Sequence, residues 1–355
     1  MPRWALIVPL AAIALLVAAL LLPGRTLLLV LCALALIGAV QAAVYHAEVV
    51  AHRVGEPFGT LVLALAVTVI EVALIVSVML AGGAEKAALA RDTIYAAVMI
   101  ICNGVVGLCL LVGGLRHHSQ AYRIEGASSS LAALVALATL SLVLPSFTTS
   151  SPGATYTTAQ LAFAAVVSLA LWAVYVFVQT VRHRDYFLPA GEPSNDEVHA
   201  APPSSTLALA SFGLLLVALI AVVGLAKVLS PSIEAAVAAS GAPKTVIGIA
   251  IALLVLLPET VAAVRAAHLN RLQTSFNLAY GSALASIGLT IPAVAVASVW
   301  MDLPLVLGLD PKDLVLLTLT FIVSAITLTY GRTHMMHGAV HLVIFAAFAF
   351  LSLAP

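Results

Sequence analysis

The chain consists of apolar stretches of about 20 residues that follow one another along its 355 residues. A stretch of this length crosses the roughly 30 Å hydrocarbon core of a bilayer as a helix, which satisfies its own backbone hydrogen bonds. The sequence therefore predicts an all-α polytopic membrane protein. We predict eleven transmembrane helices, at residues 4–22, 26–45, 57–81, 92–114, 127–146, 158–181, 205–229, 244–267, 275–300, 312–330 and 335–353.

Composition excludes several other classes of protein. Hydrophobic residues make up 63% of the chain, charged residues 8%, and the formal net charge is zero. No basic face therefore attracts nucleic acid, and no soluble segment is long enough to form its own core. The cysteines Cys32, Cys102 and Cys109 lie inside predicted helices without metal-ligand spacing, so we expect them to pack as apolar side chains. The expected surroundings are membrane lipid, inorganic cations and protons, with no cofactor.

The distribution of lysine and arginine predicts the orientation of the chain. With a cytoplasmic N-terminus, nine basic residues fall on the cytoplasmic side and six on the other side, which favours this orientation and places the C-terminus outside. The polar, proline-rich stretch Arg182 to Ser205 is then a cytoplasmic linker. We expect the plasma (inner) membrane as the location, and we expect the first helix to be retained, because no small-x-small cleavage site precedes Pro23.

Two carboxylates interrupt the apolar stretches. Glu71 lies in the middle of residues 61–80, and Glu259 follows Pro258 within residues 246–267. An acid near the bilayer centre costs roughly 2.5 to 3.5 kcal/mol on insertion scales, so such residues usually face a bundle interior or an ion path. Each glutamate therefore marks a candidate functional site.

The surroundings of the two glutamates repeat. Six residues separate Glu48 from Gly55, and one residue separates Gly55 from Pro57. The same spacing relates Glu234, Gly241 and Pro243. Each motif leads into the helix that carries the central acid. Downstream, further positions match in the same order, among them Thr93 with Thr274 and Gly107 with Gly288. These matches indicate an internal duplication.

The duplication predicts an inverted repeat. The first repeat contains five helices, an odd number, so the second copy must enter the membrane from the side opposite to the first. We divide the chain into a leading helix (1–25), a first five-helix repeat (26–181), the linker (182–205) and a second five-helix repeat (206–355). Transporters with this architecture bind their substrates near the bilayer midplane, where the repeats meet.

Two carboxylates at one midplane site have a predictable chemistry. Desolvation and mutual repulsion favour their neutral forms, so protons and a cation compete for Glu71 and Glu259. Ca²⁺ prefers six to eight oxygen ligands, and carbonyls, hydroxyls and water would complete its shell. Pro258 removes an amide hydrogen and frees carbonyl oxygens of residues 254–257, and Thr68 presents a hydroxyl on the face of Glu71.

Other residues are secondary candidates. Asn103 and Ser282 are candidate cation ligands, although small polar residues within the membrane also serve helix packing. The acids Glu48 and Glu234 are candidate pathway residues or ordinary interfacial acids, and the Gly55–Pro57 and Gly241–Pro243 pairs are candidate hinges. The last helix carries His334, His337 and His341 on one face. This trio could bind a transition metal or make interhelical contacts.

The segments around the two acids resemble the calcium/cation antiporter superfamily, in its cation/proton exchanger branch, and most closely the bacterial ChaA-type sodium/calcium to proton antiporters. The segments that carry the resemblance are AHRVGEPFGTLVLALAVTVIEVALI (51–75), RDTIYAAVMIICNGVVG (91–107), LPETVAAVRAAHLNRLQTSFNLAYGSALASIGLTIP (257–292) and GAVHLVIFAAF (338–348). The resemblance implies one leading helix plus two inverted five-helix repeats, and it implies that Glu71 and Glu259 bind the cation and carry protons.

The sequence departs from the family in neutral ligands. Many members carry Gly-Asn-x-x-Glu in each repeat, whereas Val67 and Thr68 precede Glu71, and Val255 and Leu256 precede Glu259. A site with fewer side-chain oxygens suits Na⁺ or K⁺ as well as Ca²⁺.

Function follows as an expectation. We expect an antiporter that exports Ca²⁺, with Na⁺ or K⁺ as further substrates, in exchange for H⁺ by alternating access. The alternatives are a Na⁺(K⁺)/H⁺ antiporter with little Ca²⁺ transport, a passive cation channel, and an intramembrane hydrolase built on the terminal histidines.

Overall fold

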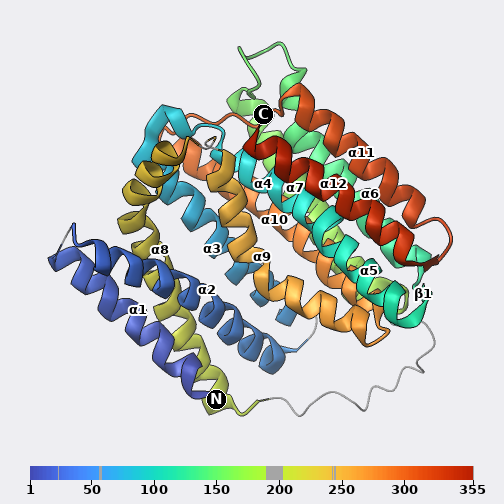
Figure 1. Ribbon diagram of the computed structural model, residues 1–355, viewed down its shortest axis with the longest axis horizontal. Coiled ribbons are helices and arrows are strands. Elements are labelled where there is room, and N and C mark those ends of the chain that lie inside the picture. Colours follow the sequence, from blue (N-terminus) through green and yellow to red (C-terminus); the bar gives the residue numbers. More distant parts are fainter. Residues whose placement is uncertain (23, 56–57, 189–202, 242, 244, 355) are drawn as a thin grey trace. The chain divides into compact units, whose positions relative to one another are not determined.

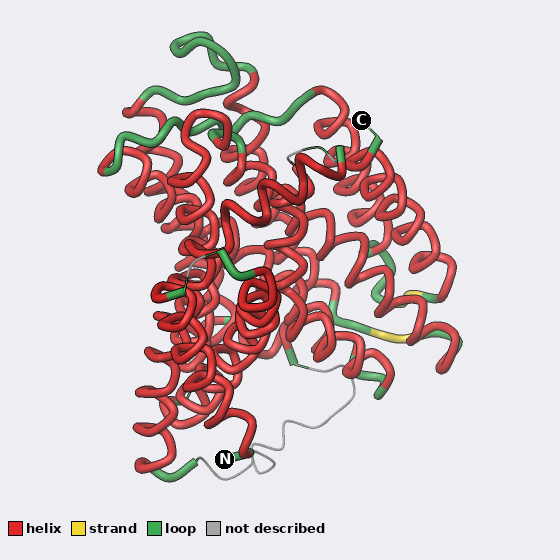
Figure 2. The backbone as a smooth tube through the Cα atoms, turned by 60° about the vertical axis from the view of Figure 1, so that its left-hand side comes forward, coloured by secondary structure: helices red, strands yellow, loops and turns green. Residues whose placement is uncertain are grey.

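The computed structural model describes the whole chain apart from residues 23, 56–57, 189–202, 242, 244 and 355. Helices dominate the tube in Figure 2, and within the described residues the strands form one short pair. Among the described residues, ten helices are long and apolar enough to cross a membrane. This finding agrees with the predicted multi-pass architecture. The remaining predicted segment is also helical and has 17 residues.

The helices lie where the sequence predicts them. Their bounds are α1 Arg3–Leu21, α2 Thr26–Val54, α3 Phe58–Gly82, α4 Leu89–Met99, α5 Val106–His117, α6 Ile124–Ala138, α7 Thr158–Phe177, α8 Ser205–Ser240, α9 Thr245–His268, α10 Leu272–Trp300, α11 Pro311–Thr327 and α12 Met335–Leu353. Short π-helices continue three of them, at Ile100–Val105, Thr139–Val143 and Val178–Arg182. Three 3₁₀ turns complete the helical elements, at Gly83–Lys86, Leu144–Ser146 and Arg184–Phe187.

One predicted segment contains a change of helix type. The stretch predicted at residues 92–114 is α4 followed by a π-helix, Ile100–Val105, and then by α5. We refer to Ile100–Val105 as the π-turn. π-Turns within α-helices occur frequently at functional sites, because the wider turn changes the direction of the side chains around it.

The described chain forms two compact units. Unit 1 holds residues 1–86 and 196–247, and unit 2 holds residues 87–195 and 248–355. Each unit therefore combines helices from both of the predicted repeats. Glu71 belongs to unit 1, whereas Asn103 and Glu259 belong to unit 2.

Unit 1 is built from α1, α2, α3 and α8. The helix α2 packs along α8, α1 and α3, and α1, α2 and α8 lie side by side in Figure 1. His46 Nε2 lies 2.8 Å from the carbonyl oxygen of Ala5, which ties α2 to α1. Arg53 Nη2 donates to Ser205 Oγ over 2.7 Å, so the end of α2 lies beside the start of α8.

Unit 2 is built around α10 and the α4–α5 helix. The helix α10 packs against α6 and α7, and α12 packs along α5. Gly338 allows this second approach, because a Cβ atom there would lie 2.4 Å from the backbone nitrogen of Leu111. Close helix packing in membranes commonly depends on such small residues. The two strands, β1 Gln120–Ala121 and β2 Arg332–Thr333, are the exception to the predicted all-α fold, and they pair antiparallel at the loops that adjoin α5 and α12.

Candidate cation-binding site

Glu71 lies in α3 and is almost completely buried, with 2% of its surface exposed. Thr68 precedes it by three residues and is also buried, so both side chains belong to the inner face of α3 within unit 1. The helix packs against α2 and α8. A carboxyl group with so little exposure is consistent with the predicted intramembrane acid.

Glu259 lies in α9 and is half-buried. The helix continues through Pro258 rather than ending there, so Pro258 acts as a local defect within a helix. Because proline has no N–H, the carbonyl of Leu254 has no partner for its regular helical bond. The Thr260 hydroxyl donates to the Leu256 carbonyl over 2.7 Å.

The two ends of α9 approach the start of α4 and the end of α5, so α9 has the same direction as the α4–α5 helix. At the start of α9, a Cβ atom at Gly248 would lie 2.9 Å from the backbone nitrogen of Thr93. At its end, Gln120 Nε2 donates to the carbonyl of Ala267 over 2.8 Å, and His117 Nε2 lies 3.0 Å from the carbonyl of His268. The start of α9 therefore lies close to α4, and its end is bonded to α5 and to the loop that follows α5.

These anchors give the relative depth of Asn103 and Glu259. Asn103 follows Thr93 by ten residues, and Glu259 follows Gly248 by eleven. At about 1.5 Å per residue, both lie about 15 to 17 Å from the point where the helices approach. Asn103 and Glu259 therefore occupy similar depths in unit 2.

The Asn103 side chain takes part in a buried polar network. Its Nδ2 donates to Thr320 Oγ1 over 2.9 Å, and its Oδ1 lies 3.2 Å from His341 Nδ1. The other ring nitrogen of His341 lies 3.1 Å from Thr327 Oγ1. We call Asn103, Thr320, Thr327 and His341 the buried polar network; each is at most 2% exposed. The network joins the π-turn to α11 and α12.

Tyr122 contacts the buried polar network at Thr327. It lies in the loop between α5 and α6, and its hydroxyl donates to the carbonyl of Thr327 over 3.0 Å. Burial raises the pKa of Tyr122 to about 12, so the hydroxyl keeps its proton at neutral pH and remains a donor. Its ring contacts Phe276 edge to face, with centroids 5.0 Å apart.

The remaining candidate ligands and pathway residues differ in burial and lie on different helices. Ser282 is half-buried on α10, which packs against α4 and α5. Glu48 is exposed on α2, as a pathway acid or an interfacial acid would be. The backbone of Glu234 lies in α8.

The two predicted glycine hinges share a backbone conformation. Gly55, at the end of α2, has φ of 76°, and Gly241, just after α8, has φ of 68°. Both values lie in the left-handed region that glycine adopts without strain, which is a common way to end a helix. Pro243 is half-buried before α9, whereas Pro57 lies outside the described residues.

Of the two interpretations of the terminal histidines, metal binding and interhelical contact, the structure favours interhelical contact. His334 and His337 stack on each other, with ring centroids 4.4 Å apart, while His341 is committed to Asn103 and Thr327. In the described part of the chain, no three His, Cys, Asp or Glu side chains are grouped as metal ligands. His341 makes interhelical contacts, which is the other interpretation that the sequence offered.

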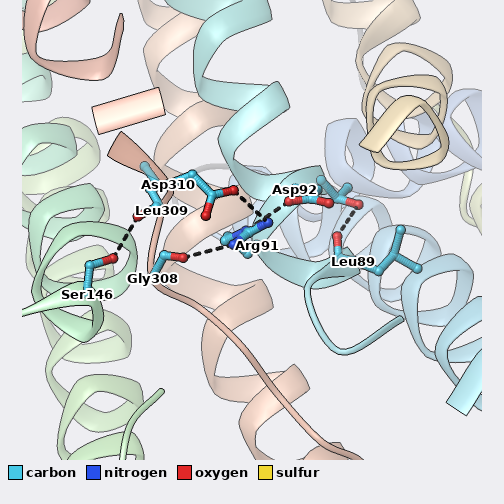
Figure 3. A network of polar contacts seen from close by, with 8 residues as sticks. Leu89, Arg91, Asp92, Ser146, Gly308, Leu309 and Asp310 are labelled. Carbon is cyan, nitrogen blue, oxygen red and sulfur yellow. Dashed lines mark hydrogen bonds and ion pairs between the residues drawn. The ribbon is translucent and has the colours of Figure 1, made fainter. Parts of the chain in front are cut away.

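A second polar network, at the start of α4, was not predicted from the sequence (Figure 3). Arg91 Nε donates to Asp92 Oδ1 over 2.9 Å, its Nη1 donates to the Gly308 carbonyl over 3.0 Å, and its Nη2 lies 3.6 Å from Asp310 Oδ2. Ser146 Oγ donates to the Leu309 carbonyl over 2.8 Å. The adjacent charges of Arg91 and Asp92 at the edge of an apolar stretch are a signal, but their distant partners are not visible in the sequence.

Comparison with known proteins identifies relatives along the whole chain. The sequence model of the family described as "Sodium/calcium exchanger protein" matches residues 25–181 and 210–354. The chain is 50% identical over 361 aligned positions to y4hA of Sinorhizobium fredii (strain NBRC 101917 / NGR234), which covers 100% of this chain and 97% of the relative. It is 36% identical over 320 positions to the sodium-potassium/proton antiporter ChaA of Escherichia coli (strain K12), covering 89% and 86% respectively.

The fold also matches a solved structure. The structure of native YfkE superposes with a TM-score of 0.75 at 18% identity, covering 99% of this chain and 100% of that chain. YfkE is described as a Ca²⁺/H⁺ antiporter in another of its solved structures. At this level of identity the match establishes a shared fold.

Proposed function

Because the chain belongs to the sodium/calcium exchanger family, whose members are secondary transporters and not enzymes, we propose that it is a proton-coupled cation antiporter that uses Glu71 and Glu259. Family membership removes the intramembrane hydrolase from consideration and argues against a passive channel. The observation that carries the proposal is the pair of intramembrane glutamates at matching places in the two sequence repeats.

The mechanism follows from the cost of unpaired charge. Two ionised glutamates in a poorly hydrated region would repel each other, so the site is stable with protons or with a cation bound. A cation from the cytoplasm displaces the protons, the neutralised site opens to the other side, and protons then replace the cation. The transporter with an empty, doubly ionised site changes poorly between its inward-open and outward-open states, so cation flux is coupled to proton flux.

The directions of helices in unit 2 support an inverted repeat. The α4–α5 helix runs from the Arg91 network toward His117, beside the end of α9. The matching helix of the second repeat, α10, begins near the loop after α5, since Gln273 Oε1 accepts from the backbone N–H of Arg123. It ends toward the Arg91 network, because Val306, a few residues beyond α10, bonds to Ala87, a few residues before α4. The two matched helices therefore run in opposite directions within unit 2.

We place the protein in the bacterial plasma membrane, with its N-terminus in the cytoplasm. Both helices that we expect to move, α2 and α8, belong to unit 1, pack on each other and end at left-handed glycines. Gly55 and Gly241 would then serve as hinges, and Glu48 and Glu234 would attract cations at opposite faces.

Two observations bear on the identity of the cation. A pair of carboxylates balances the charge of Ca²⁺, which is the transported ion that we propose. The identity to a sodium-potassium/proton antiporter and the missing asparagines before Glu71 and Glu259 favour Na⁺ or K⁺ as the second candidate. The residues that bind the ion are the same in both cases.

The experiment is cation-driven proton movement in proteoliposomes that enclose a pH dye. We expect addition of Ca²⁺ to make the lumen alkaline as protons leave, and we expect Glu71→Gln and Glu259→Gln to lose this response. Glu125→Gln, which neutralises an exposed acid in the first turn of α6, is the matched control and should behave like the parent. Glu48→Gln should raise only the half-saturating cation concentration.

Other outcomes reassign or refute the proposal. A response to Na⁺ or K⁺ but not Ca²⁺ would change the substrate and keep the site. Cation uptake without proton movement would identify a channel. Parent-like exchange by both central variants would refute the two-glutamate site.

A further inference from the structure

The buried polar network contains an ionisable group that the proposed mechanism does not use. His341 is fully buried in α12, and it bonds through both ring nitrogens, to Asn103 on one side and to Thr327 on the other. A buried polar side chain is costly unless its hydrogen bonds are made, so four such groups in contact require a structural or functional reason.

The chemistry of the network defines the protonation of the ring. The Asn103 carboxamide donates through Nδ2 to Thr320, and the Thr320 hydroxyl donates onward to the Leu316 carbonyl over 2.7 Å. Asn103 Oδ1 therefore remains as an acceptor for a proton on His341 Nδ1. The Nε2 atom of the neutral ring can then accept from the Thr327 hydroxyl.

The position of the network links it to the cation site. Asn103 lies in the π-turn, at a depth similar to that of Glu259. The helix α9 approaches the start of the α4–α5 helix at Gly248, and its His268 carbonyl lies 3.0 Å from Nε2 of His117, at the end of that helix. A change in the shape of the π-turn would therefore alter the surroundings of the cation site at the depth of Glu259.

We propose that His341 is a positioning residue for antiport: through Asn103 it holds the π-turn in the shape that the cation site requires. This inference rests on the proposed function. His341 does not carry the transported proton, because its two nitrogens are engaged with the uncharged groups of Asn103 and Thr327. Its removal should therefore change cation affinity and leave the proton coupling intact.

The test compares His341→Leu, Asn103→Leu and the double variant in the proteoliposome assay. Because each single change breaks the same buried hydrogen bond, we expect each to raise the half-saturating cation concentration about fivefold to tenfold. The double variant should be no worse than the more affected single variant, since residues that act as a unit are not additive. The proton-to-cation ratio should remain that of the parent.

Two further variants separate positioning from packing. His341→Gln, whose amide N–H can still donate to Asn103, should recover most of the affinity. Phe348→Leu removes buried volume from α12 and breaks no hydrogen bond, so it should leave the half-saturating concentration unchanged.

Three outcomes would overturn the inference. These are additive effects in the double variant, a changed proton-to-cation ratio in His341→Leu, or parent-like affinity in that variant. If Glu71→Gln and Glu259→Gln show no cation-driven proton movement and His341→Leu has the cation affinity of the parent, only the role of His341 is refuted. Active glutamate variants would refute the proposed function itself.

Discussion

Arg91 illustrates how single residues hold the loops of unit 2. Its side chain is 10% exposed, and it joins the start of α4 to the segment before α11 through Asp92, Gly308 and Asp310. The partners Arg91 and Gly308 are 217 residues apart in sequence. Sequence patterns could single out Glu71 and Glu259 as candidate site residues, because an acid in an apolar stretch is visible locally. They could not predict the partners of Arg91 or His341, because side-chain pairing over such separations depends on how helices pack.

Replacing Arg91 tests this network. Arg91→Met leaves the largely buried Asp92 carboxylate without its cation, so we expect a loss of about 2 kcal/mol in stability and a lower melting temperature. Arg91→Met combined with Asp92→Asn removes both charges and should recover part of the loss. Thermal unfolding of the detergent-solubilised protein, followed by tryptophan fluorescence, measures both. If the double variant is less stable than Arg91→Met, the ion pair is not what stabilises this region.

At the scale of elements, each segment predicted from the sequence coincides with a helix of the described chain, but the lengths and types of these helices were not fully predicted. The predicted helices at 26–45 and 205–229 are α2, with 29 residues, and α8, with 36 residues. A hydropathy pattern predicts the end of a helix where the apolar residues end, whereas the helix itself continues into polar surroundings wherever its backbone hydrogen bonds remain favourable. The π-turn at Asn103 was also not predicted, because a wider turn has no hydropathy signal.

The contact between α5 and α12 gives a prediction for these elements. A methyl group at Gly338 would lie 2.4 Å from the Leu111 backbone nitrogen and 2.8 Å from the Gly107 carbonyl oxygen, and backbone cannot move aside as a side chain can. We expect Gly338→Ala to destabilise the protein by about 1 to 3 kcal/mol. The control is Gly213→Ala in α8, where a Cβ would meet no atom within 4 Å. It should be neutral or stabilising by up to about 1 kcal/mol, because alanine favours the helix. Equal melting temperatures for the two variants would contradict close packing at Gly338.

At the scale of the molecule, the contacts within unit 2 fit the alternation of loops between two membrane faces. The loops after α5, α9 and α11 meet at one end, through the β1–β2 pair and the bond from Gln120 to Ala267. The residues before α4, after α6 and after α10 meet at the other end, where Val306 bonds to Ala87 and Leu307 bonds to Ala154. The predicted orientation assigns the first group to the cytoplasm and the second to the outside. Every contact named here joins loops of the same predicted side.

This orientation can be measured with single cysteines. The native cysteines Cys32, Cys102 and Cys109 are buried, so they should contribute little background to labelling by a membrane-impermeant maleimide. In intact cells we expect Ser151→Cys, in the loop between α6 and α7, to be labelled, because that loop lies outside. Ser119→Cys, in the loop after α5, should be labelled only in everted vesicles or after permeabilisation. The reverse pattern would invert the chain in the membrane, so that Glu48 would adjoin the outer face and Glu234 the cytoplasmic face, while the opposed directions of α4–α5 and α10 would remain. Labelling of both positions from one side would contradict the passage of α6 through the membrane, and with it the odd number of helices in the first repeat on which the inverted repeat depends.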